Sequence, residues 1–424
     1  MTSEPAYRDA FVWIWLPDSC DPVVAGRLVN DNGYLLFNYG KSYLQRPDAI
    51  PIYEPELPLR SGQLPLVGGL SMPGCIRDGS PDAWGRRVII NQKLGLQGNR
   101  VDTAELDELT YLLESGSDRI GALDFQCSPT NYIPRLSASA TLEQLLTSAE
   151  RIEQGLPVPK ELEQALHHGT SIGGARPKAL IEDGDNKYIA KFSSSSDLYS
   201  VVKAEFIAMR LASLTGLNVA DVSLAQAAGK DVLLIRRFDR ELTNKTNKGW
   251  CRKHMVSALT LHGLDEMMAR YTSYEQLADL VRQRFSCAPQ TLRELFGRLV
   301  FNILCGNTDD HARNHAAFWD GRMLTLTPAY DICPQGRTRQ IATQAMLIKG
   351  NQRQSQLSLC LQAADIFLLT REQAKDIIEH QKATIEKFWV EVCDEAELSE
   401  VDRTLFRGRQ FLNPYSFENY PGLG

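Results

Sequence analysis

The sequence lacks several features that would assign a chain of this length to a particular class of protein. No stretch approaches the roughly 18 uninterrupted apolar residues expected of a membrane-spanning helix. The nine cysteines are scattered and form no C-x-x-C pair, which argues against a disulfide framework and a zinc site. The start of the chain has no basic segment before its apolar run, so we interpret that run as a strand and not as a signal peptide. These absences indicate a cytoplasmic protein with reduced thiols.

An excess of positive charge is also lacking. The 424 residues carry a net charge of −6, and 43% are apolar and 23% charged, which is an ordinary globular mixture. Such a chain is not built to bind nucleic acid by itself, although a local basic patch or a basic partner would still permit binding. The length allows two or three domains with cores of their own.

Short apolar segments and turn residues alternate in the first part of the chain, where residues 11–67 read as β-rich. Helical patterns follow at about 82–97 and at 102–115, and together these elements predict a small α+β domain over residues 1–130. The strands are expected at residues 11–16, 23–29 and 34–39, with an Asn-Asp-Asn-Gly turn between the last two.

The middle of the chain, residues 131–250, begins with two more helical stretches over 134–168. A β-hairpin is then predicted over 178–192, where two alternating segments flank Asp-Gly. From residue 251 to 424 the pattern is mainly helical. Further elements are expected as a helix at 198–216, a strand at 231–240, and helices at 291–304 and 371–397.

Acidic and amide side chains are concentrated between residues 305 and 334. A hydroxyl nucleophile needs an acceptor for its proton, and a phosphoryl donor needs Mg²⁺ held by hard oxygen ligands. Protein kinases use an aspartate as the acceptor, an asparagine five residues later for one metal ion and a second aspartate for the other. Asn314 follows Asp309 by five residues, and Asp331 follows an alternating segment that predicts a returning hairpin. For each acid alone, a helix cap or a polar loop is the alternative interpretation.

A second dense group of polar residues lies in "GTSIGGARPKAL", residues 169–180. Gly173 and Gly174 permit close approach of the backbone to an anion, and Arg176 and Lys178 add positive charge beside them. The pattern matches neither the Walker loop nor the dinucleotide-binding fingerprint. A tight turn is therefore the alternative interpretation of the two glycines.

Three further features follow the glycines in the order known from kinases. Lys191 lies in an apolar strand, where kinase-like folds place the lysine that holds the α- and β-phosphates. Glu205 lies on the next predicted helix, where a glutamate pairs with that lysine. Residues 233–240, "LLIRRFDR", fit a hinge whose backbone groups would contact adenine. The alternatives are an edge lysine with its amine in solvent and a solvated charge on the helix.

In this order the motifs resemble those of the HipA-like serine/threonine kinases, the toxin half of bacterial toxin–antitoxin pairs. The resemblance runs in patches from about residue 11 to about residue 395. It implies an α+β fold of the protein-kinase-like two-lobed type, with a β-rich N-terminal lobe that carries an N-terminal subdomain and an all-α C-terminal lobe. The matching segments are "VVAGRLV", "GYLLFNY", "IRDGSPDAWGRRVI", "ESGSDRIGALDF", "TSIGGARPKAL", "YIAKF", "IRRFDR", "NTDDHARNH" and "YDICP".

The resemblance also implies roles for individual residues. Asp309 would be the catalytic base, within a catalytic loop that includes His311 and Asn314, and Asn314 and Asp331 would bind Mg²⁺. Ser171 would be the site of autophosphorylation, and a phosphate there would displace the glycine loop and inactivate the enzyme. ATP would contact Ser171, Gly173, Gly174, Ala175, Arg176, Pro177, Lys178, Lys191, Glu205, Arg236, Arg237, Phe238, His311, Ala312, Arg313, Asn314 and Asp331.

The partners that the resemblance implies are a protein substrate and an antitoxin. The family's substrates are aminoacyl-tRNA synthetases, notably the glutamyl enzyme, whose phosphorylation stops growth. The antitoxin is a small, dimeric, HipB-like helix-turn-helix protein that binds operator DNA, so an acidic chain would reach DNA only through it. No membrane partner is expected.

Two departures from the family pattern and two other functions stay open. Asp310 occupies a position where glycine is common in the family, and we expect its side chain to be solvated. The stretch 134–168 is longer than expected before the glycine loop. A nucleotide-binding pseudokinase that acts only as a co-repressor is one alternative, which is disfavoured because the sequence contains Lys191, Asp309, Asn314 and Asp331. A Mg²⁺-dependent nuclease is the other, which the net charge of −6 does not favour.

Overall fold

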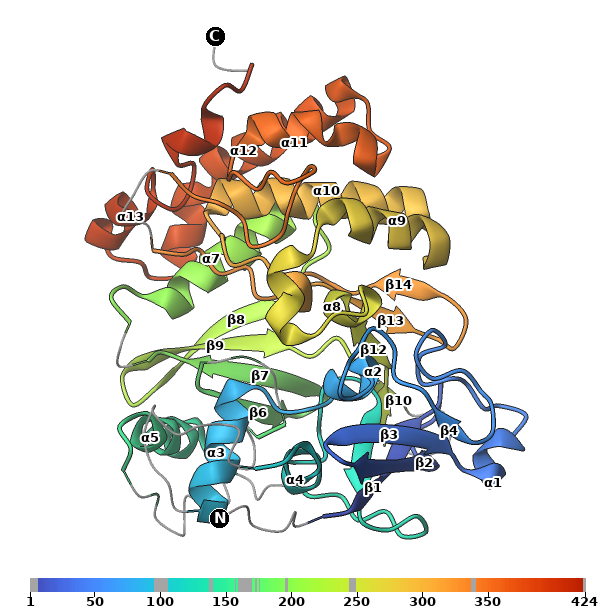
Figure 1. The fold of residues 1–424 in the computed structure, drawn as a ribbon. Helices are drawn as coiled ribbons and strands as arrows, with labels where there is room; N and C mark the ends of the chain where they lie inside the picture. Colours follow the sequence, from blue (N-terminus) through green and yellow to red (C-terminus); the bar gives the residue numbers. More distant parts are fainter. Residues whose placement is uncertain are drawn as a thin grey trace. The chain divides into compact units, whose positions relative to one another are not determined.

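The described part of the chain divides into two compact units in the computed structural model (Figure 1). Unit 1 comprises Met1–Ser196, Ala225–Val256 and Phe318–Arg322, and unit 2 comprises Asp197–Leu224, Ser257–Ala317 and Met323–Gly424. Each unit contains segments distant in sequence, whereas the sequence analysis divided the chain into consecutive ranges. The structure describes residues 7–94, 106–136, 140–156, 158, 170–171, 174, 176–194, 197–243, 249–336 and 341–421.

A five-stranded sheet opens unit 1, and every strand pair in it is antiparallel. The predicted strands at 11–16, 23–29 and 34–39 are confirmed. The turn between the second and third has only Asn32 and Gly33, both with the positive φ that a two-residue hairpin turn requires. In the order β4-β3-β2-β1-β5 the strands are Gln63–Leu64, Tyr34–Tyr39, Pro22–Asp31, Asp9–Trp15 and Leu123–Gln126.

Two helices of unit 1, α4 and α5, start at polar capping residues. Asp107 accepts a hydrogen bond from the backbone of Thr110, and Thr141 and Gln144 form a reciprocal capping box. The helices predicted at 82–97 and 102–115 are present, and one of the two predicted within 134–168 is present, while the second lies outside the described residues. The helices are α1 (Lys41–Leu44), α2 (Gly74–Arg77), α3 (Ala83–Leu94), α4 (Glu108–Glu114) and α5 (Leu142–Glu153).

A second sheet, in the order β6-β7-β9-β8, carries the glycine loop at the start of its first strand. The predicted hairpin is β6 (Lys178–Asp183) with β7 (Asn186–Phe192), and the two strands pair through to Asp183 and Asn186. Helices α3 and α5 pack on this sheet through Trp84, Leu145 and Phe192, which are all buried. The remaining strands of the region are β8 (Val222–Ala227), β9 (Lys230–Arg236), β10 (Arg240–Thr243) and β11 (Gly249–Arg252).

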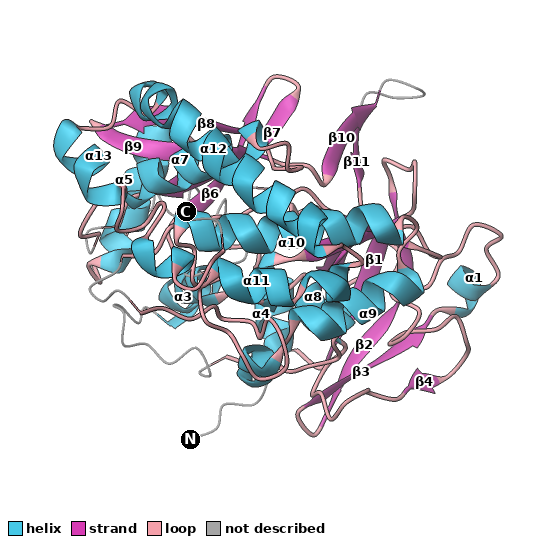
Figure 2. Cartoon of the chain, turned by 90° about the horizontal axis from the view of Figure 1, so that it is seen from above, coloured by secondary structure: helices cyan, strands magenta, loops and turns pink. Residues whose placement is uncertain are grey.

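Unit 2 is mainly helical and is centred on α10. The predicted apolar periodicity over 291–304 produces a helix whose core positions Leu292, Leu295, Leu299 and Ile303 are fully buried. Helices α10, α11 and α12 pack against one another (Figure 2). The helices are α7 (Val201–Leu214), α8 (Ala258–Leu261), α9 (Tyr274–Arg284), α10 (Ala288–Cys305), α11 (Leu357–Gln362), α12 (Arg371–Glu395) and α13 (Glu400–Phe406).

The C-terminal lobe, predicted as all-helical, also contains short strands. The alternating residues before Asp331 favour an extended backbone, because successive side chains then point to opposite faces. These strands form a three-stranded sheet of β12 (Met255–Ser257), β13 (Ala316–Trp319) and β14 (Leu324–Leu326). The 3-10 helices of this part of the chain are η3 (Glu266–Tyr271), η4 (Ala312–Asn314), η5 (Ala364–Phe367) and η6 (Pro414–Phe417). The predicted α+β class is confirmed. None of the described helices is long and apolar enough to cross a bilayer.

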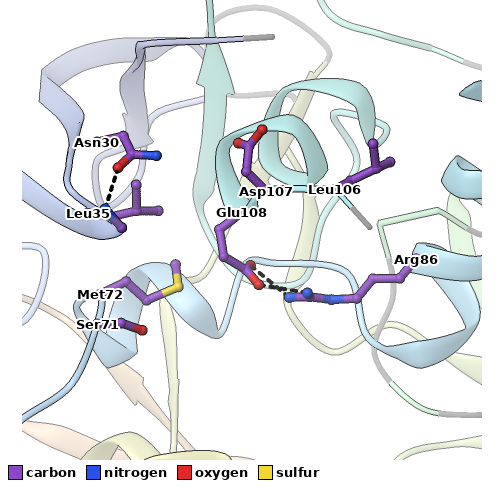
Figure 3. Close-up of a pocket in the computed structure, with 9 residues that line it drawn as sticks. Asn30, Leu35, Ser71, Met72, Arg86, Leu106, Asp107 and Glu108 are labelled. Atoms are coloured by element: carbon purple, nitrogen blue, oxygen red, sulfur yellow. Dashed lines mark hydrogen bonds and ion pairs between the residues drawn. The ribbon is translucent and has the colours of Figure 1, made fainter. Parts of the chain in front are cut away.

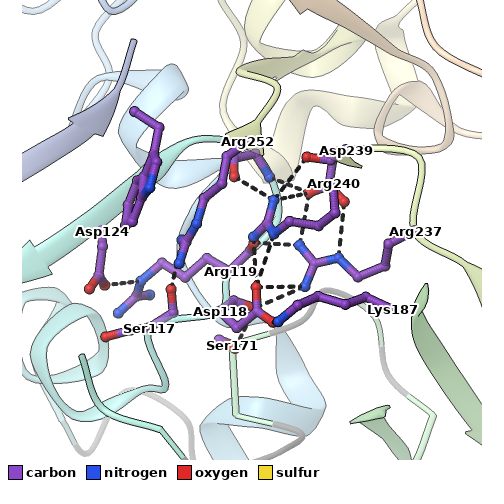
Figure 4. Close-up of polar contacts among 12 residues, drawn as sticks. Ser117, Asp118, Arg119, Asp124, Ser171, Lys187, Arg237, Asp239, Arg240 and Arg252 are labelled. Atoms are coloured by element: carbon purple, nitrogen blue, oxygen red, sulfur yellow. Dashed lines mark hydrogen bonds and ion pairs between the residues drawn. The ribbon is translucent and has the colours of Figure 1, made fainter. Parts of the chain in front are cut away.

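A buried cluster of charges joins two distant segments of unit 1 (Figure 4). Arg237 donates to both oxygens of Asp239, at 2.9 and 2.8 Å, and to Asp118 Oδ1 at 3.1 Å. Arg240 donates to Asp118 Oδ1 at 2.8 Å and to Asp239 Oδ2 at 2.9 Å. The ammonium group of Lys187 lies 2.8 Å from Asp118 Oδ2. Two carboxylates and three cations therefore satisfy one another, with Arg237, Asp239 and Arg240 buried and Asp118 and Lys187 partly exposed.

The electrostatics of this charge cluster follow from its composition. Burial opposes ionisation of Asp239, but Arg237 and Arg240 outweigh it and lower the pKa of Asp239 to about 2. The same balance, with Lys187 added, lowers the pKa of Asp118. Because removing one member leaves a buried charge without its partner, the cluster stabilises unit 1 only as a whole.

The first prediction is that Asp239→Asn destabilises the chain by about 3 kcal/mol at pH 7, since Arg237 and Arg240 lose a buried counter-charge. The folded-state pKa lies below the usual 3.8, so this stabilisation is present above about pH 4 and is lost as the pH falls towards about 2. Urea unfolding of the full chain at pH 7 and at pH 3 measures both effects. Asp48→Asn, which alters an exposed ion pair with Arg46, is the control and should change little. Equal unfolding midpoints for Asp239→Asn and the wild type at pH 7 would contradict the role of the cluster.

Candidate functional site

The acidic motif of unit 2 begins where α10 ends. Gly306 has a φ of 75°, and a Cβ at this position would lie 2.6 Å from the carbonyl oxygen of Gln410, so only glycine fits. Asn307 then fixes the loop, because its backbone N–H donates to Asn302 O at 2.8 Å and its amide to Asn302 Oδ1 at 3.0 Å. The loop that carries Asp309 is thus tied to the buried end of the central helix.

Asp309, Asn314 and Asp331 are brought together as the sequence predicted. The Asn314 amide nitrogen donates to the carbonyl oxygen of Asp309 at 3.2 Å, while the hydroxyl of Tyr330, next to Asp331, donates to the carbonyl oxygen of Arg313 at 2.8 Å. Asp331 has a φ of 59°, which is unusual for a residue with a side chain and is typical of constrained functional positions. The turn after β14 and the loop after α10 therefore form one site.

The electrostatic environment of Asp309 suits a proton acceptor. Its side chain reaches solvent, yet partial burial raises the pKa of its carboxyl group. His311 opposes this shift, whereas the negative charges of Asp331 and Asp310 add to it. A carboxylate with a raised pKa is a stronger base than an ordinary aspartate, as general-base catalysis requires.

Asp310 is not solvated, contrary to our expectation. Its side chain is 2% exposed, its Oδ1 lies 2.9 Å from His315 Nε2, and it accepts a hydrogen bond from the Tyr274 hydroxyl. Burial would raise the pKa of Asp310, but His315 and Tyr274 outweigh burial and lower it. Asp309 therefore faces solvent, whereas the buried Asp310 anchors the loop through His315 and Tyr274. His315 and Tyr274 are the residues that the sequence analysis missed.

The other residues of the loop are engaged within unit 2. Ala312 is fully buried, and Arg313 forms an ion pair with Glu266. The Nδ1 atom of His311 is buried and has no hydrogen-bond partner among the described residues. A buried ring nitrogen that lacks a hydrogen-bond partner is typical of a site in which a bound polar group supplies that partner.

The glycine loop in unit 1 is held against the start of α3. Gly174 has a φ of 104°, its N–H donates to Asp82 Oδ2 at 2.5 Å, and its carbonyl oxygen accepts from Trp84 N at 3.2 Å. Ser171 is only 3% exposed, and its hydroxyl donates to the carbonyl oxygen of Asp118 at 3.4 Å. The predicted contacts Gly173 and Ala175 lie outside the described residues.

Two lysines of the predicted phosphate site stand opposite each other on the hairpin. Lys178 and Lys191 are paired across β6 and β7, so their side chains leave the same face of the sheet. Both are buried, and a Cβ on Gly174 would lie 2.1 Å from Lys178 Nζ, which places that amine against the glycine loop. Two cations side by side near a glycine turn favour binding of an anion. An edge lysine with its amine in solvent does not describe Lys191.

The residues predicted for the hinge and for the helix differ in burial and in their contacts. The side chain of Arg237 is fully buried in the charge cluster, so its guanidinium does not line an adenine site, and the backbone N–H of Arg237 donates to Lys187 O at 2.8 Å. Arg236 is exposed and Phe238 partly buried. Glu205 on α7 is 2% exposed and is not a solvated charge. It belongs to unit 2 and Lys191 to unit 1, so their pairing stays a prediction.

The side-chain oxygens near Asp309 can bind a hard cation only if a nucleotide supplies further oxygen ligands. Among the described residues, no group of three or more histidine, cysteine or acidic side chains is placed to hold a metal ion. Asn314 and Asp331 supply one amide oxygen and one carboxylate. Mg²⁺ is commonly bound by one or two such groups together with water and substrate phosphates. The residues present therefore fit a magnesium ion that arrives with a nucleotide.

A separate pocket of about 380 Å³ lies in unit 1, between the N-terminal sheet and the helices α3 and α4 (Figure 3). Its polar feature is the ion pair of Arg86 with Glu108, at 2.6 Å. It contains none of the predicted site residues. The residues that line it are Asn30, Gly33, Leu35, Ser71, Met72, Arg86, Leu106, Asp107 and Glu108.

Comparison with known proteins places this site in a family context. The HipA-like C-terminal domain matches residues 170–389, and the HipA N-terminal domain matches residues 16–126. Y4mE of Sinorhizobium fredii, whose name proposes a kinase, is 25% identical over 341 residues, which are 74% of this chain and 75% of that protein. The serine/threonine-protein kinase toxin HipA of Shewanella oneidensis is 25% identical over 242 residues, which are 51% of this chain and 54% of the toxin.

The fold has a solved counterpart. HipA from the Shewanella oneidensis complex of HipA, HipB and operator DNA superposes with a TM-score of 0.68 and 21% sequence identity, over 94% of this chain and 93% of that chain. Its likeness establishes the fold. Since the matched C-terminal domain covers more than half of the residues, the chain belongs to the HipA-like family of protein kinases.

Proposed function

We propose that this chain is an ATP- and Mg²⁺-dependent serine/threonine protein kinase that arrests growth as the toxin of a toxin–antitoxin pair. The observation that carries the proposal is the environment of Asp309. Its carboxyl group has a raised pKa, it faces solvent, and the Asn314 amide and the Asp331 turn lie beside it. This combination is what transfer of a phosphoryl group to a protein hydroxyl requires of a catalytic loop.

Each residue of the candidate site has a defined role in the proposed reaction. Asp309 accepts the proton of the acceptor hydroxyl, while Asn314 and Asp331 hold the metal ion. When bound, Mg²⁺–ATP supplies the phosphoryl group and a counter-charge for its oxygens. Lys178 and Lys191 neutralise phosphate charge from the hairpin, and Gly174 lets the backbone approach the phosphates. Positioning and charge neutralisation are sufficient in this class of reaction, because the protein forms no covalent bond to the phosphoryl group.

Ser171 is the proposed site of autophosphorylation. Its hydroxyl is 3% exposed and bonded to the backbone of Asp118, so it must leave this position to be modified. A phosphate adds about two negative charges and three acceptor oxygens, which do not fit where the serine is enclosed. The modified loop therefore cannot return to its place, and the phosphate site is lost.

The proposed partners follow from family membership and from the chemistry of the site. The Shewanella oneidensis HipA was solved with HipB and operator DNA, and we infer a HipB-like helix-turn-helix antitoxin for this chain. An antitoxin that binds DNA suits a chain whose own net charge is −6. The proposed protein substrate is an aminoacyl-tRNA synthetase, with the glutamyl enzyme as the first candidate, in the cytoplasm.

The decisive experiment is incubation of the full chain with Mg²⁺ and γ-labelled ATP, alone and with glutamyl-tRNA synthetase. Asp309→Asn should lower phosphoryl transfer by at least about a hundredfold and leave the fold intact, because it removes the proton acceptor without changing its shape. Asp376→Asn, which changes an exposed acid on α12, is the control and should be fully active. Unchanged activity of Asp309→Asn would refute the role of this residue. A wild-type chain that binds ATP and transfers nothing would instead be a pseudokinase.

Ser171→Ala should abolish label on the peptide that contains residue 171 and should prolong activity towards an added substrate, because the inactivating modification can no longer form. Phosphopeptide mass spectrometry after incubation with ATP measures the first effect, and a time course of substrate labelling measures the second. Ser193→Ala, on the partly buried loop after β7, is the matched control. If the loop carries the same amount of phosphate in Ser171→Ala, the assignment is wrong.

Asp310→Asn should lower kcat by about tenfold to a hundredfold with little change in the KM for ATP, since Asp310 positions the catalytic loop and does not touch the nucleotide. It should also destabilise the chain by about 2 kcal/mol, because Tyr274 and His315 lose a buried ionic partner. Steady-state kinetics and thermal unfolding of the variant measure both effects. Tyr274→Phe, which removes one of the two partners of Asp310, should give a smaller change of the same kind. A variant with wild-type kcat would show that Asp310 has no positioning role.

A further inference from the structure

We propose that Cys20 and Cys251 form a redox-active pair that closes to a reversible disulfide when a hydroperoxide reacts with it. The two sulfur atoms lie 3.0 Å apart although 231 residues separate them in sequence. Cys20 lies in the connection between β1 and β2, and Cys251 lies on β11. Both thiols are partly exposed, so a small oxidant reaches them without unfolding of unit 1.

The surrounding structure holds the backbones of the two cysteines near each other. The indole N–H of Trp15 donates to the carbonyl oxygen of Cys20 at 3.0 Å. The guanidinium of Arg252, adjacent to Cys251, lies 3.5 Å from the centre of the Trp15 ring and donates to Ser117 O at 2.8 Å. Cys20, Trp15, Arg252 and Cys251 thus form a closed chain of contacts that holds the two cysteine backbones close together.

The two thiols have different parts in the reaction. Burial and the hydrogen bond with Cys20 raise the pKa of the Cys251 thiol to about 12, so Cys251 keeps its proton at neutral pH. Cys20 is therefore the nucleophile and Cys251 the resolving thiol. The 3.0 Å distance between the two sulfur atoms supports the disulfide itself, and the raised pKa of Cys251 decides only which sulfur reacts first.

The chemistry is balanced by the hydroperoxide. The Cys20 sulfur attacks the peroxide, so that an S–O bond forms and the O–O bond breaks. The departing oxygen takes the proton of the Cys20 thiol and leaves as an alcohol or water. The Cys251 sulfur then attacks the Cys20 sulfenic acid, an S–S bond forms, and the departing oxygen takes the Cys251 proton and leaves as water. Two thiols are oxidised, one peroxide is reduced, and a dithiol reductant reverses the reaction.

The position of the pair gives the disulfide a structural consequence. Cys251 pairs with Glu241 across β10 and β11, and Arg240, the first residue of β10, belongs to the buried charge cluster. A bond to Cys20 would therefore tie the β10–β11 hairpin covalently to the N-terminal sheet, in addition to the ionic contacts of Arg240 with Asp118. Oxidation would constrain the hairpin that begins at the last residue of the predicted hinge.

The test uses the full chain in its reduced state, exposed to a modest excess of hydrogen peroxide and digested without reduction. We expect loss of two of the nine free thiols, a cross-linked peptide that joins Cys20 to Cys251, and full reversal by dithiothreitol. The oxidised chain should have a higher unfolding temperature than the reduced chain. Peroxide that instead modifies the exposed Cys127 and Cys287 while Cys20 and Cys251 stay reduced would overturn the proposal.

Two variants assign the roles. In Cys251→Ser, Cys20 should stop at the sulfenic acid, which dimedone traps. In Cys20→Ser, Cys251 should stay reduced under the same exposure. Cys287→Ser is the control and should form the cross-link at the wild-type rate. Dimedone labelling of Cys251 in Cys20→Ser, at the rate seen for Cys20 in Cys251→Ser, would contradict the assigned order.

Discussion

Arg237 and Arg240, both buried, bind the same two carboxylates, the buried Asp239 and the partly exposed Asp118. The bonds join segments about 120 residues apart, at the end of β9 and in the connection between α4 and β5. Neither segment could bury its charges alone, because an isolated buried ion is too costly to leave uncompensated. Ser171 is bonded to the backbone of Asp118, so the same cluster also supports the resting position of the glycine loop.

In unit 2 the corresponding constraint acts on two adjacent aspartates. Asp310 is anchored inside by His315 and Tyr274, and this anchor leaves Asp309 directed to solvent with Asn314 and Asp331 around it. The two pKa values shift in opposite directions. Burial, with the charges of Asp331 and Asp310, raises the pKa of Asp309 against the effect of His311, whereas His315 and Tyr274 outweigh burial and lower the pKa of Asp310. The chain thereby obtains a structural anion and a basic carboxylate from consecutive residues.

The β10–β11 hairpin connects the predicted hinge of the proposed kinase with the proposed thiol pair. The predicted hinge ends at Arg240, which is also a member of the charge cluster and the first residue of β10, and Cys251 lies on the strand paired with β10. A disulfide to Cys20 would act on the hairpin through the same backbone that the ionic cluster already fixes. Redox state would thus change the rigidity of this region without altering the residues proposed to contact ATP.

Local patterns in the sequence determined the hairpin of β6 and β7, the core helix α10, the turn at Gly33, and the spacing that unites Asp309 with Asn314 and Asp331. These features depend on residues close in the chain, whose periodicity and turn chemistry the sequence displays directly. Tertiary structure alone decided three other features. Asp310 is buried, Arg237 forms ion pairs, and Cys20 contacts Cys251. Each depends on partners that the chain brings together only when it folds, and no local pattern records which charge or thiol will be enclosed.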